Sequence, residues 1–434
     1  MYIREAHPKD SNWALGHDVD DPTTFEERVG VAKQCTSALE LSIPCVVDDL
    51  KDTVNQLYNG WPERLYVIGT DKRIVYKGGV GPFGFKPAEV EAVLQGGAKL
   101  GDAKPETPST TPKKLPVFIL LGQSNMVGFG RIEAKTDRGT LAYYCEEEGK
   151  YPHLRDEDGT WKLRDDVWCV KTTTGQKQGP LAPGFGARAN FFGPELQFGH
   201  VIGDLYEEPV LLIKASQGNR SLGWDILPPG TPRFEHGGRV YAGSGDKAPS
   251  WVEGQPKQEV NWYAGKQYDD FVRDIHEVLD NLPKFYPAAK DREVEIAGFA
   301  WWQGHKDQNA AHASRYEFNL VNLIKNLRKE FQAPAAPFAI ATIAFGGDKL
   351  QGPGLEVLEA QLAVSGERGK YPEFAGNVKS IDARGFWRAR DISPSGQDYH
   401  YHHNAETYIE VGNALGQAMA EMLRRKAKTP KTPR

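Results

Sequence analysis

The residue best placed to do chemistry is Ser124, which follows seven mostly branched apolar residues at 115–121 and the turn residues Gly122 and Gln123. Such a run is typical of a buried parallel strand, and the glycine predicts a turn that carries the serine hydroxyl to a sheet edge. In open α/β sheets ligands bind outside the carboxyl ends of the strands, where a base on another loop can remove a serine proton. Because a strand followed by Gly-x-Ser is common, the rest of the chain decides the role of Ser124.

Two further segments end in small or polar residues after predicted strands. Residues 214–220 read KASQGNR, where Gly218 either lets backbone N–H groups approach a ligand closely or forms an ordinary turn. Residues 301–305 read WWQGH, where the Gln303 amide is a candidate hydrogen-bond donor. Core packing is the simpler interpretation for one of the two tryptophans.

A candidate base lies near the C-terminus, in the run QDYHYHH at 397–403. Asn404 follows as a predicted N-cap, so His400 is expected on a loop just before a helix. The histidines at 400, 402 and 403 also suggest a zinc site, but no carboxylate or cysteine partners occur at metal-ligand spacing. No metal is therefore expected.

The elements that must position these residues are apolar strands separated by helical patterns. Strands are predicted at residues 115–121, 209–215, 294–302 and 338–345. Between the last two, apolar residues recur at helical spacing: Tyr316, Leu320, Ile324, Leu327 and Phe331. Strands alternating with helices predict a parallel sheet in a three-layer α/β/α domain. The charged, glycine-rich segment 129–192 interrupts this rhythm and is expected to form a loop over the strand ends.

Composition excludes several classes of protein. The chain has 434 residues, 39% apolar and 26% charged, with a formal net charge of −5. No basic stripe suits nucleic acid, and no window approaches the roughly 18 apolar residues of a membrane span. Met1 is followed by YIRE rather than by a signal peptide. The four cysteines, Cys35, Cys45, Cys145 and Cys169, form no CxxC and cannot be a disulfide framework.

A linker is predicted at residues 96–114, which are rich in proline and have almost nothing to bury. It separates a unit at 1–95 from a larger one at 115–426, and a flexible tail is expected at 427–434. The smaller unit is expected to be mixed α/β with a terminal hairpin. Its predicted elements are helices at 25–39 and 87–94 and strands at 43–47, 65–68 and 73–76.

Taken together, the motifs of the larger unit resemble the sialate O-acetylesterase-like family, SGNH hydrolases that also include acetylxylan esterases. The matching pieces come in the family's order over residues 115–423: GQSNM at 122–126, KASQGNRSLGW at 214–224, WWQG at 301–304 and DYHYHHNAETY at 398–408. The resemblance implies a flavodoxin-like SGNH fold with Ser124 as nucleophile and His400 as general base. It also implies an oxyanion hole of the Ser124 and Gly218 backbone N–H groups with the Gln303 side chain, and no cofactor.

The chemistry of ester hydrolysis agrees with these roles. A serine hydroxyl needs an imidazole to remove its proton, and the same imidazole later protonates the leaving sugar oxygen. Donors aimed at the tetrahedral oxyanion each contribute about 10²–10³ in rate. Contacts to an acetylated carbohydrate are expected from four neighbouring residues: Gln123, Asn219, Trp302 and His305.

The third member of the triad departs from the family's pattern. SGNH enzymes commonly place an aspartate three residues before the histidine, where this chain has Gln397. Asp398, two residues before His400, is therefore predicted to orient the imidazole. Many relatives also have a glutamate after the Gln-Gly pair, where this chain has His305, so a possible carboxylate partner is lost.

Residues 1–95 resemble the iodothyronine deiodinase family, a branch of the thioredoxin fold. The resemblance rests on YIREAHPKDSNWAL and WPERLYVIGTDKRIVYKGGVGPFGF. The family's reactive selenocysteine or cysteine belongs to a strand and helix that would precede Tyr2. Either this unit is a redox-silent remnant, or the reading frame begins upstream of a UGA selenocysteine codon. Cys35 and Cys45 are interpreted as small buried apolar residues, without redox chemistry.

The sequence thus favours a serine esterase that removes acetyl groups from a carbohydrate. One alternative is a catalytically weak carbohydrate-binding protein on the same scaffold, and in either case four tryptophans are candidates to stack on sugar rings: Trp224, Trp251, Trp262 and Trp302. Another is a thiol or selenol reductase, which depends wholly on sequence upstream of Met1. Nothing in the sequence identifies the sugar or the oligomeric state. Relatives that act on polysaccharides are commonly exported, which favours a periplasmic or extracellular site.

Overall fold

The computed structural model describes the chain in two compact units, Met1–Thr111 and Pro112–Arg434. The described residues are 19–20, 22–58, 60, 63–70, 72–79, 85–95, 114–156, 158–173, 175–289 and 291–428. The start of the chain, nearly all of the predicted linker and the last residues of the predicted tail lie outside these ranges. The boundaries at 95, 114 and 426 therefore stay predictions.

The N-terminal unit contains the predicted helices and hairpin. Its elements are α1 (Phe25–Ala38), α2 (Thr53–Tyr58), the antiparallel pair β1 (Tyr66–Ile68) and β2 (Ile74–Lys77), and α3 (Pro87–Gln95). A capping box between Thr24 and Glu27 starts α1.

Two expectations for this unit are wrong. Residues 43–47 do not form a strand, because side chains such as Ile43 are mostly exposed and gain nothing from an extended backbone. Cys35 is half-buried and Cys45 is exposed, so neither behaves as a fully buried apolar residue.

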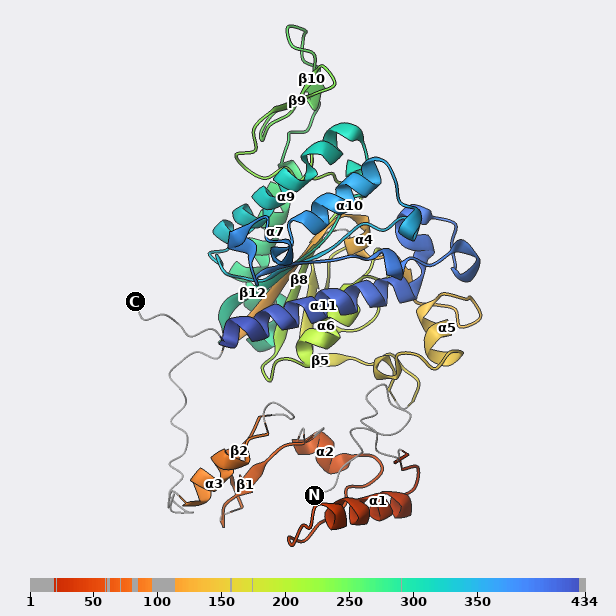
Figure 1. Ribbon diagram of the computed structural model, residues 1–434, viewed down its shortest axis with the longest axis vertical. Coiled ribbons are helices and arrows are strands. Elements are labelled where there is room, and N and C mark those ends of the chain that lie inside the picture. Colours follow the sequence, from red (N-terminus) through yellow and green to blue (C-terminus); the bar gives the residue numbers. More distant parts are fainter. Residues whose placement is uncertain are drawn as a thin grey trace. The chain divides into compact units, whose positions relative to one another are not determined.

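A seven-stranded sheet forms the middle layer of the second unit (Figure 1). Its spatial order is β14 (Val378–Ile381), β13 (Phe338–Ala341), β12 (Glu293–Trp302), β3 (Lys114–Gly122), β8 (Val210–Ser216), β5 (Arg164–Lys171) and β6 (Lys177–Leu181). Neighbouring strands run parallel, except that β6 is antiparallel to β5. The strand that leads to Ser124, β3, is central, so its carboxyl end lies between those of β12 and β8.

Side chains of β3 alternate between two apolar cores, as a strand buried on both faces requires. Ile119 and Leu121 belong to the core that holds α7 (Lys266–Asp280), α9 (Ala310–Glu330) and α10 (Pro353–Ala363). Phe118 and Leu120 belong to the core that holds α6 (Glu195–Gly203) and α11 (Ala405–Lys428). The helices therefore form two outer layers, and the unit is the three-layer α/β/α domain expected from the sequence (Figure 1).

The four predicted strands are present as β3, β8, β12 and β13, although β13 ends at Ala341, short of the predicted end. The interpretation of 129–192 as a loop over the strand ends is wrong, because this segment supplies β5 and β6 of the sheet. It also supplies the shorter elements β4 (Gly130–Arg131), α5 (Leu141–Glu146) and β7 (Phe191–Phe192). The sequence did not predict β5, because only four uncharged residues, Val167 to Val170, lie between the charged residues at its two ends.

A small sheet of three short strands is inserted between β8 and α7, and it projects from the domain (Figure 1). It comprises β9 (Phe234–His236), β10 (Arg239–Tyr241) and β11 (Ser250–Trp251). Trp251 is buried within it, in a cluster with Val240 and Ala248. Of the helices in the described part of the chain, none is long and apolar enough to cross a membrane.

Candidate active site

Ser124 is the first residue of a one-turn helix, α4 (Ser124–Val127), that directly follows β3. Its side chain is almost buried. The turn needs glycine at 122, because φ is +156° and a Cβ there would lie 2.2 Å from the carbonyl oxygen of Trp302. Backbone N–H groups in the first turn of a helix lack intrahelical acceptors. The Ser124 N–H is therefore available to a ligand at the sheet edge.

Gly218 lies beside Ser124, in the loop that follows β8. Strand register pairs Gly122 with Ser216, and a Cβ built on Gly218 would lie 3.8 Å from the Ser124 Cβ. Among the described residues, neither Ser124 nor Gly218 donates its backbone N–H to another group of the protein. The structure thus brings together two of the three predicted oxyanion donors.

The third predicted donor, Gln303, follows β12 but has its amide occupied inside the protein. Its Nε2 lies 2.9 Å from the Arg220 carbonyl oxygen, 2.7 Å from Asp307 Oδ2 and 3.1 Å from Gln123 Oε1. Its Oε1 accepts from the Tyr316 hydroxyl over 2.8 Å. Three acceptors surround a nitrogen that carries two hydrogens. The expectation that Gln303 donates to an oxyanion is therefore not met, and Gln303 instead joins the loops after β8 and β12.

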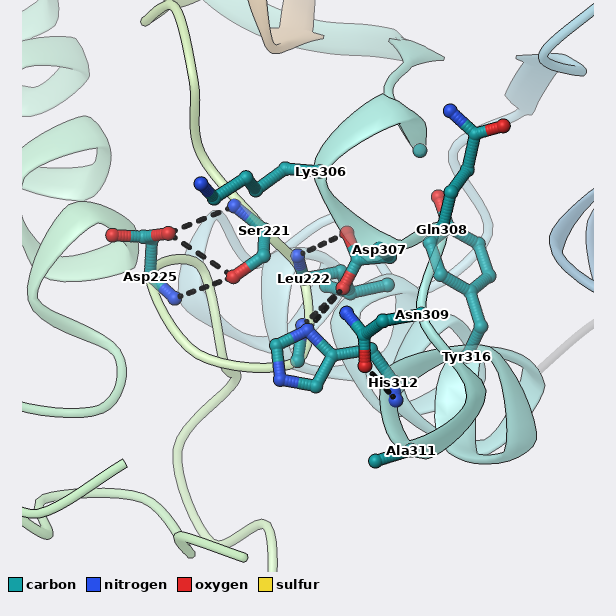
Figure 2. A network of polar contacts seen from close by, with 12 residues as sticks. Ser221, Leu222, Asp225, Lys306, Asp307, Gln308, Asn309, Ala311, His312 and Tyr316 are labelled. Atoms are coloured by element: carbon teal, nitrogen blue, oxygen red, sulfur yellow. Dashed lines mark hydrogen bonds and ion pairs between the residues drawn. The ribbon is translucent and has the colours of Figure 1, made fainter. Parts of the chain in front are cut away.

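Asp307 completes this junction between loops and was not anticipated from the sequence. Its fully buried carboxylate accepts from the backbone N–H groups of Leu222 and Gly223, each over 2.8 Å, and from Gln303. His312 Nδ1 lies 3.3 Å from the same carboxylate, at the start of α9. Figure 2 shows the carboxylate between the Leu222 backbone and the His312 ring. Asp307 thereby fixes the loop that carries Gly218.

His400 lies on a tight turn, Asp398–His403, immediately before α11. Asn125, next to Ser124, donates from Nδ2 to the Tyr399 carbonyl oxygen over 3.3 Å. Its Oδ1 accepts from the buried Tyr408 hydroxyl over 3.0 Å, and that hydroxyl is also 3.3 Å from the His400 carbonyl oxygen. The nucleophile turn and the histidine turn are thus held together through Asn125.

No hydrogen bond joins the Ser124 hydroxyl to the His400 imidazole within the described structure. Catalytic hydrogen bonds are often long before substrate binds and tighten in the complex. The two residues share one edge of the sheet, and Asn125 and Tyr408 limit how far apart they can move.

Asp398 does not orient His400, contrary to the expectation from the sequence. Its carboxylate accepts from the Tyr399 backbone N–H over 2.8 Å, and within the described residues it makes no hydrogen bond to the imidazole. The group beside His400 Nδ1 is Gln397, whose Oε1 lies 3.2 Å away. The turn places residue 397, rather than residue 398, on the imidazole side.

The wall behind His400 is aromatic. The Phe129 ring stacks on the imidazole with centroids 3.8 Å apart and planes 10° apart, and Phe191 lies against His403. Burial, followed by the charges of His403 and His305, lowers the pKa of His400 to about 3. The imidazole is therefore neutral near pH 7 and able to accept a proton.

Three lysines support this wall by holding consecutive carbonyl groups of the loop before Phe191; Lys171 and Lys214 are buried and Lys177 is exposed. Lys177, Lys214 and Lys171 donate to the carbonyl oxygens of residues 184, 185 and 186, respectively. Lys214 and Glu195, both fully buried, form an ion pair of 2.6 Å. Lys214 belongs to β8, so the strand that leads to Gly218 also fixes the wall.

The four residues expected to contact substrate fall into two groups. Gln123 and Trp302 are 1% exposed and hold the core: Gln123 Oε1 accepts from backbone N–H groups after β12, and Trp302 donates to the Thr342 carbonyl oxygen. Asn219 is exposed beside Gly218 in a left-handed conformation, φ +57°. His305 lies between the rings of Phe345 and Tyr399, and burial lowers its pKa. Only Asn219 and His305 have surface that could contact a ligand.

The tryptophans proposed to stack on sugars also differ in exposure. Trp251 and Trp302 are buried, whereas Trp224 and Trp262 are half-buried. Trp262 lies under the guanidinium of Arg220, with 4.9 Å from Cζ to the ring centroid. Among the described residues, no three His, Cys, Asp or Glu side chains converge as metal ligands.

Known families match both parts of the chain. Residues 114–421 match the family described as carbohydrate esterase, sialic acid-specific acetylesterase. Residues 1–97 match the iodothyronine deiodinase family.

Individual relatives match the same two parts of the chain. A probable carbohydrate esterase from Arabidopsis thaliana is 32% identical over 325 residues, which cover 73% of this chain and 95% of that protein. Type I iodothyronine deiodinase from Xenopus laevis is 37% identical over 97 residues, which cover 22% of this chain. The match spans 37% of that deiodinase, little more than a third of its length.

Two solved structures are similar to the chain. A protein from Arabidopsis thaliana has a TM-score of 0.42 at 19% identity, covering 71% of this chain and 98% of that one. A carbohydrate acetylesterase from Xanthomonas citri has a TM-score of 0.40 at 14% identity, covering 70% and 55%.

Proposed function

The chain belongs to the carbohydrate esterase, sialic acid-specific acetylesterase family and is a carboxylic ester hydrolase, and we propose that it removes O-acetyl groups from a carbohydrate with Ser124 as nucleophile. His400 is the general base in this proposal. The oxyanion is held by the backbone N–H groups of Ser124 and Gly218.

The proposed reaction passes through an acetyl-enzyme. His400 takes the proton of Ser124 as the hydroxyl oxygen attacks the acetyl carbonyl carbon. The tetrahedral oxyanion collapses, the bond to the sugar oxygen breaks, and His400 returns its proton to that oxygen. A water molecule then attacks the acetyl group, with His400 again as base, and releases acetate and free Ser124.

One observation carries this proposal: the contact of Gly218 with Ser124. A Cβ built on Gly218 would lie 3.8 Å from the Ser124 Cβ, and neither residue's backbone N–H has an acceptor in the described protein. Donors fixed in this way need no reorganisation when charge develops on the carbonyl oxygen, and each contributes about 10²–10³ in rate. The buried carboxylate of Asp307 supports this geometry, because it fixes the Gly218 loop through Leu222 and Gly223.

A panel of acetylated saccharides tests the substrate class. The panel holds O-acetylated sialic acid, acetylated xylo-oligosaccharides and peracetylated glucose, and released acetate is measured for the full chain and for Ser124→Ala. Ser124-dependent acetate release from any member supports the proposal. Saccharide binding without acetate release supports the alternative of a carbohydrate-binding protein and contradicts the proposed hydrolysis.

A further inference from the structure

Gln397 places its side-chain oxygen between two imidazoles. Its Oε1 lies 3.2 Å from His400 Nδ1 and 2.9 Å from His403 Nε2. An amide oxygen has two lone pairs and only accepts hydrogen bonds, so both of these ring nitrogens carry hydrogens in this arrangement. In the neutral His400 ring the hydrogen is then on Nδ1, and the lone pair of Nε2 is free to accept a proton. With the amide reversed, Nε2 would carry the hydrogen and could not accept a proton from Ser124.

The backbone of Gln397 holds the same turn. Its carbonyl oxygen accepts from the N–H groups of His400, over 3.1 Å, and His402, over 2.9 Å. The turn needs such an anchor, because Tyr401, His402 and His403 have φ values of +51°, +56° and +60°. A left-handed conformation is unfavourable for a residue with a side chain, because the Cβ crowds the following carbonyl oxygen. Gln397 therefore fixes both the path of the turn and the ring of His400.

The surroundings of His400 leave this role to Gln397. The titratable groups that face the imidazole are Tyr399 and His403 on the same turn and His305 after β12, and Tyr408 of α11 contacts its carbonyl oxygen. Phe129 covers one ring face with apolar surface. The acidic group of the turn, Asp398, is hydrogen-bonded to the Tyr399 N–H instead.

His403 in turn holds the amide of Gln397. Its ring packs edge-on against Phe191, with centroids 5.3 Å apart, and lies 5.8 Å from the ring of Phe129. Both phenylalanines belong to the wall that the three lysines support. The exposed side chain of Gln397 is therefore fixed from the protein side by His403.

We propose that Gln397 is the positioning residue for His400: its neutral amide oxygen, held by His403, keeps the hydrogen of the imidazole on Nδ1 and leaves Nε2 as the base. The inference rests on the proposed roles of Ser124 and His400. During the reaction the imidazolium faces an amide dipole rather than a carboxylate. The enzyme is then a serine esterase whose third member is uncharged.

Three variants of the full chain test the proposal, with p-nitrophenyl acetate as substrate. Gln397→Leu removes the acceptor, and because a correctly held base contributes about 10²–10⁴ in rate, kcat should fall at least 10-fold with KM nearly unchanged. Gln397→Glu keeps the acceptor and adds a charge, so kcat should survive. The acid limb of kcat/KM should then move up by about 1–3 pH units. Asp398→Asn, the matched control, should change kcat by less than about 2-fold, since its amide oxygen still accepts from Tyr399.

A second measurement does not depend on activity. Deuterium exchange at the imidazole C2 position, read by mass spectrometry, follows the titration of His400 in each variant. Gln397→Glu should shift the titration of His400 upward. This readout remains decisive if Gln397→Leu fails to fold.

The outcomes separate this inference from the proposed function. A larger loss of kcat in Asp398→Asn than in Gln397→Leu would overturn the inference. So would an unchanged titration of His400 in Gln397→Glu. Unchanged hydrolysis in Ser124→Ala would instead overturn the proposed function, while the exchange measurement would still report whether Gln397 contacts His400.

Discussion

The hydroxyl of Tyr408 lies 3.0 Å from Asn125 Oδ1, inside the core and next to the proposed nucleophile turn. Tyr408 belongs to α11, and Asn125 follows Ser124. Burial raises the pKa of Tyr408 well above its usual value, so the hydroxyl remains a donor. One buried hydrogen bond thus connects the C-terminal helix to the nucleophile turn.

Replacing Tyr408 by phenylalanine should uncouple the two turns. Asn125 Oδ1 would lose its buried donor, which costs about 1–3 kcal/mol of unfolding free energy. Since the His400 turn would also lose its link to Ser124, kcat should fall more than the stability loss explains. Tyr144→Phe is the control, because Tyr144 is also buried and its hydroxyl contacts Asn404 over 3.3 Å, away from Ser124. Equal kcat values for the two variants would show that the Tyr408 bond is only structural.

Gly218→Ala should fold normally and lose activity. The added Cβ would meet only the Ser124 side chain, at the ordinary contact distance of 3.8 Å, and the backbone needs no left-handed conformation there. The methyl group would, however, occupy the space beside the nucleophile, and a misplacement of about 1 Å can cost 10²-fold in rate. Circular dichroism and kcat/KM on p-nitrophenyl acetate measure the two effects. Gly385→Ala, at a site with open space around it, controls for the general effect of the substitution.

Asp307→Asn should weaken both stability and catalysis. An asparagine offers one acceptor oxygen where the carboxylate accepts from Leu222, Gly223 and Gln303, and its NH2 group would face backbone donors. Hydrogen bonds to a charged group contribute about 1.5–3 kcal/mol, so a loss of this size in unfolding free energy is expected. If the loop then moves, kcat falls and KM changes less. An unchanged kcat in a destabilised variant would show that Asp307 does not support the proposed oxyanion site.

The buried histidine His200 should make the stability of the folded protein depend on pH. Burial lowers the pKa of this histidine to about 3, far below its ordinary value. As pH falls below that ordinary value the unfolded chain takes up a proton that the folded chain does not, so stability is lost down to about pH 3. The slope is about 1.4 kcal/mol per pH unit. Urea unfolding of His200→Phe between pH 7 and pH 4 should therefore show a shallower loss of stability than the wild type. Parallel slopes for the two proteins would contradict the prediction.

Sequence reasoning predicted the sheet and the ends of its central strands, because long apolar runs signal strands buried on both faces. It missed β5, whose charged ends mask four central residues, and β14, which has only four residues in all. It also assigned residues 43–47 to a strand from their apolar character alone, although the side chains of 43–46 are exposed in the structure.

The candidate site was predictable where a motif fixed the backbone, as at Ser124 and Gly218. It was not predictable where one side chain has several possible hydrogen-bond partners. The spacing of Asp398 and Gln397 relative to His400 differs by one residue, and the folded turn rather than the spacing decides which of them faces the ring. The sequence shows that Gln303 carries a hydrogen-bond donor. It does not show which buried acceptors surround that donor, because they come from loops far apart in the sequence. Asp307, four residues beyond Gln303, was the signal that could have revealed this junction.

The most direct test of the account is the fate of the acetyl group. The full chain is mixed with p-nitrophenyl acetate, quenched in acid within the first turnover, digested and examined by mass spectrometry. We predict a burst of p-nitrophenol and one acetyl group on Ser124, with both absent in Ser124→Ala. Hydrolysis that persists in Ser124→Ala, or an acetyl group found only on another residue, would contradict the central claim that Ser124 is the nucleophile.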